Sequence, residues 1–115
     1  MGETAFEGFM PSGEHTVWQD SETGLQRKTV SPPSRNLDGE VVECMIPPGQ
    51  RIAYAEPPRP GLEHQLVMLT GEFRLTVDEQ THRLRSGNCL RYRLHGPSAF
   101  ETNRRSGAKY LIFMV

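Results

Sequence analysis

Side chains that could do chemistry are few in this sequence, and the most informative is His64. It precedes two apolar runs, Leu66–Leu69 and Phe73–Val77, and is therefore a titratable group at the edge of a stretch that must be buried. A neutral imidazole can hydrogen-bond a ligand or bind a metal ion. It can equally be a core histidine whose ring nitrogens bond to the backbone or to a buried carboxylate. Both interpretations of His64 stay open.

Hydroxyl groups form a second set of candidates. Tyr54 and Tyr92 could supply hydroxyls to a pocket, although plain wall residues are the more common role for tyrosine. Ser98 is expected to fill space and to bond to the backbone, because no Ser-His-Asp spacing supports a nucleophile. The sequence contains no base, nucleophile and orienting group whose spacing implies a reaction.

Arginines occur in pairs with the spacing of one strand face, Arg83 with Arg85 and Arg91 with Arg93. A solvated outer face with Glu partners is the favoured interpretation. A pair that faced a pocket would instead indicate an anionic ligand, because guanidinium groups hold carboxylates bidentately. Trp18 is expected in the core or in a dimer interface, where aromatic residues are enriched.

The elements that must position these groups are strands. Leu66–Leu69 is apolar throughout, as in a strand covered on both faces, and Phe73–Val77 alternates with a period of two. We expect these runs to form a hairpin with a tight turn at Gly71, which tolerates positive φ. About nine or ten short strands with Gly and Pro between them, and no convincing helix, predict an all-β sandwich or barrel. We expect an N-terminal arm at 1–14 and a barrel at 15–115.

The composition limits the class of protein. The 115 residues suffice for one domain with its own core. Lys and Arg number 13 and Asp and Glu number 14, so a formal charge of −1 gives no support to a nucleic-acid or membrane surface. No apolar run approaches the roughly 20 residues of a membrane span, and the first residues lack the features of a signal peptide. We therefore expect a cytoplasmic protein in which Cys44 and Cys89 are reduced.

From about Trp18 to Val115 the sequence resembles the cupin superfamily. The first cupin motif, G(X)5HXH(X)3–4E(X)6G, ends on a glycine that matches Gly71. The second motif, a Gly-Asp turn followed by Pro, His and Asn, matches the segment from Ser86-Gly87-Asn88-Cys89 to Pro97-Ser98-Ala99-Phe100. The resemblance implies a double-stranded β-helix, a jelly-roll barrel of two antiparallel sheets.

A narrower resemblance is to the C-terminal cupin sensor domains of bacterial XRE-type helix-turn-helix regulators. It rests on WQDSETG at 18–24, SPP at 31–33, IPPG at 46–49, EH at 63–64 and GPSAF at 96–100. It implies a domain that binds a small effector without touching nucleic acid itself, and a homodimer with Trp18 in the contact. Residues 1–14 are too few for a DNA-binding bundle, so we expect an excised sensor domain or a stand-alone relative.

The resemblance also bears on metal binding. Cupin metal ligands are two histidines and a carboxylate from the first motif and one histidine from the second. Counting back from Gly71 places the carboxylate position at His64 and the two histidine positions near Pro58 and Pro60, while the second-motif histidine falls on Ser98. A metal site needs three or four converging donors. We therefore expect no cofactor, with a divalent metal ion as the less favoured alternative.

The sequence thus predicts a small-molecule-binding cupin domain with its ligand between the sheets and no catalytic residue. If His64 takes the motif position, it points into the barrel with Leu66 and Met68, and Glu63 points outward. Two alternatives stay open: a metal-dependent isomerase or oxygenase, and an interaction module whose barrel is filled by side chains. The predicted ligand-binding residues are His64, Met68, Ser98, Phe100 and Tyr54.

Overall fold

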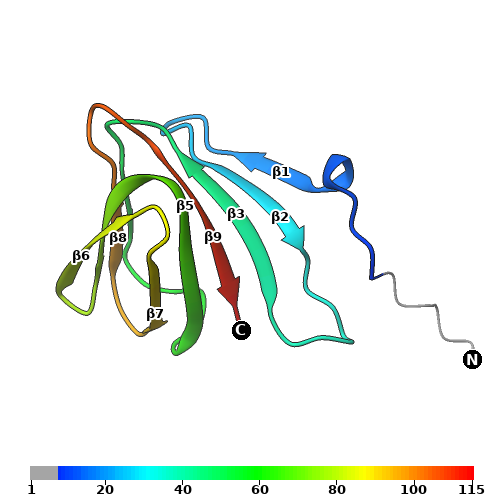
Figure 1. The fold of residues 1–115 in the computed structure, drawn as a ribbon. Helices are drawn as coiled ribbons and strands as arrows, with labels where there is room; N and C mark the ends of the chain where they lie inside the picture. Colours follow the sequence, from blue (N-terminus) through cyan, green and yellow to red (C-terminus); the bar gives the residue numbers. More distant parts are fainter. Residues whose placement is uncertain (1–7) are drawn as a thin grey trace, which may run out of the picture.

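The structure, a computed structural model, describes residues 8–115 and consists mainly of strands (Figure 1). This confirms the predicted all-β class. Residues 1–7 of the predicted arm lie outside the described residues. No helix in the described part is long and apolar enough to cross a membrane. The elements are η1 (Ser12–Glu14), β1 (Thr16–Gln19), β2 (Gln26–Ser31), β3 (Glu40–Ile46), β4 (Arg51–Tyr54), β5 (Leu62–Val77), β6 (Gln80–Arg85), β7 (Cys89–Leu94), β8 (Ser98–Glu101) and β9 (Ala108–Met114).

The strands form two sheets that share β5 (Figure 1). One sheet contains β1, β2, β3, β9, the first half of β5, and β7. The other contains β4, β8, the second half of β5, and β6. Every pairing is antiparallel, and the inner faces of the two sheets enclose one core. This is the jelly-roll barrel that the sequence predicts.

Strand β5 is a single strand of 16 residues, so the hairpin predicted at Gly71 is wrong. Gly71 has a φ of 77°, but it lies just after a bulge at which the register with β9 shifts between Met68 and Thr70. A β-carbon on Gly71 would collide with the carbonyl oxygen of Gly107. Turns and bulges both favour glycine with positive φ, so the glycine alone does not distinguish them. Here the bulge lets β5 leave one sheet and enter the other.

The actual turn after β5 lies at Asp78 and Glu79. Their φ angles are 51° and 64°. Two consecutive residues with positive φ are typical of a type I′ hairpin turn, whose twist matches that of the flanking strands. The turn predicted at this point is confirmed, and it places β6 beside the second half of β5.

The core fills the barrel around the second half of β5 and extends to Leu66 and Met68 in its first half. Phe73 lies in a stack with Phe100 and Tyr110, with centroid separations of 5.6 Å and 5.0 Å from Phe73. Aromatic stacks of this kind bury a large apolar area in one layer. The largest side chains with no appreciable exposure are Ile46, Leu66, Met68 and Leu75.

The paired arginines lie on the outer face, as the favoured interpretation predicts. Arg83 and Arg85 each lie near the Glu72 carboxylate, at 3.7 Å and 3.4 Å. Arg93 contacts Glu63 across the β5–β7 pairing at 3.1 Å. These pairs are exposed, and exposed pairs contribute about 0–1 kcal/mol each. They give no support to an anion site on this face.

Candidate functional site

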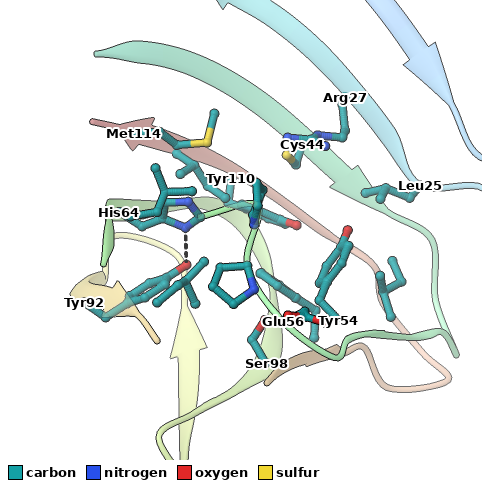
Figure 2. A pocket seen from close by; sticks show the side chains of 17 residues that line it. Leu25, Arg27, Cys44, Tyr54, Glu56, His64, Tyr92, Ser98, Tyr110 and Met114 are labelled. Atoms are coloured by element: carbon teal, nitrogen blue, oxygen red, sulfur yellow. Dashed lines mark hydrogen bonds between the residues drawn. The ribbon is translucent and has the colours of Figure 1, made fainter. Parts of the chain in front are cut away.

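A cavity of about 140 Å³ lies inside the barrel, between the two sheets (Figure 2). Strands β2, β3, β5, β7 and β9 of one sheet contribute to its wall, as do β4 and β8 of the other and the loop between β4 and β5. Phe100 and Tyr110 line the cavity and also stack on Phe73, so this aromatic layer separates the cavity from the solid core. The walls are mainly apolar, with a few polar groups, which is the usual composition of a small-molecule site.

His64 is the buried polar residue at the centre of this wall, and only 7% of it is exposed. The β5 register places it between Tyr92 of β7 and Met114 of β9. Its Nδ1 lies 3.1 Å from the Tyr92 hydroxyl, and the bond is drawn in Figure 2. Its Nε2 is buried and has no hydrogen-bond partner among the described residues. The ring therefore retains one unused hydrogen-bonding atom.

The imidazole of His64 is neutral at physiological pH. Burial lowers its pKa from 6.5 to about 4, and the positive charge of Arg27 acts in the same direction. A neutral imidazole carries one donor and one acceptor nitrogen, and the tautomer decides which is which. Nε2 can therefore meet either a donor or an acceptor on a ligand.

Three tyrosines and one cysteine of the cavity are also held neutral. Burial raises the pKa of the Tyr92 hydroxyl and that of the Tyr110 hydroxyl. Burial also raises the pKa of Tyr54, and Arg27 opposes that shift. The Cys44 thiol is free, and burial raises its pKa, so a thiolate nucleophile is not favoured there. These groups offer hydrogen bonds rather than a reactive anion.

Arg27 is a functional candidate that the sequence reasoning missed. It lies on β2, lines the cavity, and faces Cys44 in the β2–β3 register. The signal was present, because Gln26 and Lys28 mark the outer face of this strand and Arg27 therefore shares the inner face with Leu25. Leu25 is 4% exposed, whereas Arg27 remains largely exposed at the cavity edge.

The predicted ligand-binding residues are only partly brought together. His64, Ser98, Phe100 and Tyr54 all line the cavity. Tyr54 lies edge-on to Phe100 at a centroid distance of 6.1 Å. Met68 points inward as expected but does not line the cavity. It lies further along β5 than His64, in the packed core, where it pairs with Tyr110 of β9. Its assignment to the site is not supported by its position.

Three of the four positions matched to cupin metal ligands line this cavity: Pro58 and His64 from the count from Gly71, and Ser98 from the second motif. Pro60, the fourth, does not line it. Within residues 8–115, however, no group of three or more His, Cys, Asp or Glu side chains has the geometry to hold a metal ion. The donors present do not fit a protein-held metal centre, since such centres need three or four converging ligands.

Trp18 and Cys89 lie on the exposed surface of the barrel. Trp18 lies on the edge strand β1 with 53% of its surface exposed, so it is not a core residue. The homodimer that would use it stays a prediction. Cys89 is free and exposed.

Comparisons with known proteins were made at the level of sequence and of structure. No family model matches the sequence, and no curated protein matches it. Among solved structures, the cupin-2 domain of an XRE family transcriptional regulator from Enterobacter cloacae superposes with a TM-score of 0.71 at 17% identity, covering 78% of this chain and 94% of that one. A cupin-2 domain from Rhodospirillum rubrum gives 0.76 at 14% identity, covering 96% and 76%.

A third solved structure shows how varied these neighbours are. The polyketide cyclase RemF from Streptomyces resistomycificus superposes with a TM-score of 0.74 at 14% identity, covering 95% of this chain and 79% of that one. A regulator domain and a cyclase are thus similar to this chain in architecture alone, and sites rather than folds carry function. The superpositions on the cupin-2 domains show that the chain has the cupin fold.

Proposed function

We propose that this domain binds a small, largely apolar molecule in the cavity between its sheets, and that this binding is a sensing event rather than a catalytic one. The observation that carries the proposal is the buried His64 Nε2, which has no hydrogen-bond partner among the described residues and lies in the wall of a mainly apolar cavity. A buried polar atom without a partner costs about 1–3 kcal/mol. A ligand that bonds to Nε2 would recover that cost.

The size of the cavity limits the ligand. A dry apolar cavity of about 150 Å³ holds a molecule the size of benzene. At about 140 Å³, this cavity suits one ring or a short branched chain. Larger ligands would have to extend through the opening beside the loop between β4 and β5.

The same loop supports a sensing role. Glu56, Pro57 and Pro58 belong to it and line the cavity, so a bound molecule would touch a surface segment directly. Ligands shift conformational populations when they contact one state better than another. The likeness in fold to the cupin domain of a transcriptional regulator is consistent with such a role. We propose effector sensing in a regulator, or in a stand-alone relative, on these grounds.

A fragment screen tests the proposal. Compounds of up to about ten heavy atoms are added to the purified protein, and hits that raise the melting temperature are confirmed by calorimetry. His64→Phe keeps a ring of similar size but removes both nitrogens, so hits should lose at least tenfold in affinity. Met68→Leu, a change of nearly constant volume in the core, is the matched control and should leave affinity unchanged. An absence of confirmed hits, or equal affinity in wild type and His64→Phe, refutes the proposal.

A further inference from the structure

We propose that the ligand of this cavity is an anion with an apolar body, and that Arg27 receives its carboxylate at the mouth. This inference rests on the proposed function and adds the chemical class of the ligand. It depends on three features of Arg27: its place at the opening, its lack of an ion-pair partner, and the apolar walls below it.

Arg27 lies at the boundary between the cavity and a wider open groove. The groove runs past the β2–β3 loop and the end of β9, and it shares Arg27, Pro58, Leu62 and Met114 with the cavity. These four residues therefore form the passage between the two hollows. Figure 2 shows Arg27 and Cys44 on one side of the pocket, with Glu56 and Ser98 on the other. A ligand that enters from the groove must pass the guanidinium group.

The guanidinium group of Arg27 has no carboxylate within 4.0 Å in the described part of the chain. Its neighbour Lys28, on the opposite face of β2, does have one, since its ammonium lies 3.9 Å from the Glu43 carboxylate. Arg93 is paired on the outer face as well. Two neighbouring cations of one strand thus differ, and the cation directed to the cavity is the one left without a counter-charge.

The charge of Arg27 acts on the interior of the cavity. It opposes the burial-induced rise in the pKa of Cys44 and of Tyr54, and it adds to the lowering of the His64 pKa. These three residues lie on three different strands, so the field of one guanidinium reaches across the cavity. A carboxylate placed there would meet a permanent cation and, at Tyr54, a neutral hydroxyl donor. Arginine holds carboxylates through two parallel hydrogen bonds, which fixes their orientation as well as their charge.

The walls below Arg27 determine the rest of the ligand. They consist chiefly of aliphatic and aromatic side chains, and a body of about one ring fits the volume. A small monocarboxylate can place this body inside and keep its charged group at the wet rim, where the charge stays partly hydrated. Glu56 also lines the opening and would repel a second negative charge. The geometry therefore favours a monoanion over a dianion or a cation.

Benzoate and benzamide form a matched pair of probes, because they have nearly the same shape and differ in charge. Calorimetry at low and at physiological salt gives the affinity of each for the full chain. A charged hydrogen bond at a partly exposed site predicts that benzoate binds about tenfold more tightly than benzamide at low salt. The ratio should fall as salt increases, because Arg27 is exposed. Hexanoate and hexanamide repeat the comparison with a flexible body.

Two substitutions on β2 test whether Arg27 causes the preference for benzoate over benzamide. Arg27→Gln keeps the polar stem and removes the charge, so the ratio of benzoate to benzamide affinity should fall to about one. Lys28→Gln makes the same change of net charge on the outer face and should leave the ratio unchanged. Melting curves check that both variants are folded.

The outcomes separate this inference from the proposed function. A ratio near one in the wild type, or one that survives in Arg27→Gln, overturns the anion assignment. An equal fall in both variants also overturns it, because net charge would then be the cause. Binding of neither probe pair overturns it too. In each case the cavity-binding function stands if neutral fragments still bind through His64, and it fails if the fragment screen yields none or if the hits bind His64→Phe equally well.

Discussion

The two ends of β5 have the same alternation of side chains but opposite surroundings. After Gly71, Phe73 and Leu75 face a solid core closed by the aromatic stack with Phe100 and Tyr110. Before Gly71, His64 faces a cavity and retains a nitrogen without a partner. One strand thus supplies a packed end and an open end to the same barrel. Periodicity fixes which side chains point inward, but the partners across the barrel decide whether the space is filled.

This difference also divides stability from function. Close packing contributes most of the stabilisation of a small domain, because each filled site adds transfer and dispersion terms. A binding cavity gives up some of that stabilisation and leaves polar groups for a ligand. The barrel tolerates an open end because the other end is well packed. Three sets of substitutions or conditions test the difference between the packed end and the open end, and they follow in order of decreasing expected change in stability.

Gly71→Ala should have the largest effect, because it acts on the junction between the two halves. The added β-carbon would collide with the Gly107 carbonyl oxygen, and alanine is strained at a φ of 77°. We expect the free energy of unfolding to fall by at least about 4 kcal/mol, a large share of the roughly 5–15 kcal/mol that stabilises a typical domain. Chemical denaturation followed by circular dichroism measures the loss.

Gly49→Ala is the matched control for the junction. Gly49 has a φ of 72°, but a β-carbon there would meet no atom within 4 Å. Only the backbone strain should then count, at about 1–2 kcal/mol. If both variants lost the same amount, the collision with Gly107 would have no special role, and the bulge would not be the rigid junction described above.

Two leucines compare the ends directly. Leu75 has no exposed surface and lies in the packed end, whereas Leu94, 8% exposed, lines the cavity. Leu75→Ala creates a new void and should cost about 4 kcal/mol, while Leu94→Ala enlarges an existing one and should cost about 2–3 kcal/mol. Urea titrations of both variants give the difference. Equal losses would mean that the cavity end is as tightly packed as the core.

The same contrast explains which features could be predicted from the sequence. Alternation along 73–77 and the apolar run at 66–69 indicated the strands. Because every second side chain of a strand lies on the same face, His64, Leu66 and Met68 were expected to point inward together. The same alternation along β2 predicts that Arg27 lies on the inward face of that strand. The alternation did not reveal that Met68 is excluded from the cavity, because its surroundings depend on Tyr110, which is distant in sequence and opposite Met68 in the sheet.

Two further features depend on atoms that are distant in sequence. The bulge at Gly71 is distinguished from a turn by the close approach of Gly107, which a local pattern does not contain. The open volume around His64 arises because residues from seven strands and a loop leave space between them. Neither the hydrophobic period of one strand nor a sequence motif determines how much space these side chains leave between them. The two cupin motifs did indicate part of the cavity wall, since Pro58, His64 and Ser98 line it and only Pro60 does not.

The pH dependence of stability gives the smallest of the three effects and concerns the open end alone. The pKa of His64 is about 4 in the folded chain and 6.5 in an unperturbed imidazole. The unfolded chain therefore binds a proton first as pH falls. The stability linked to neutral His64 is complete above about pH 6.5 and is lost as pH decreases toward about 4. Between pH 7 and pH 4.5 the loss should be roughly 2–3 kcal/mol.

The variant His64→Gln isolates this contribution from the carboxylates that also titrate below pH 5. Glutamine is polar but does not ionise, so the variant should lose roughly 2–3 kcal/mol less than the wild type over the same range. His82→Gln, on the outer strand β6, should follow the wild-type curve. Denaturation at half-unit pH steps gives the three profiles. Parallel wild-type and His64→Gln profiles would mean that the imidazole protonates freely in the folded chain. The cavity would then be wet and adaptable, and the contrast between a packed end and a dry, ligand-ready end would not hold.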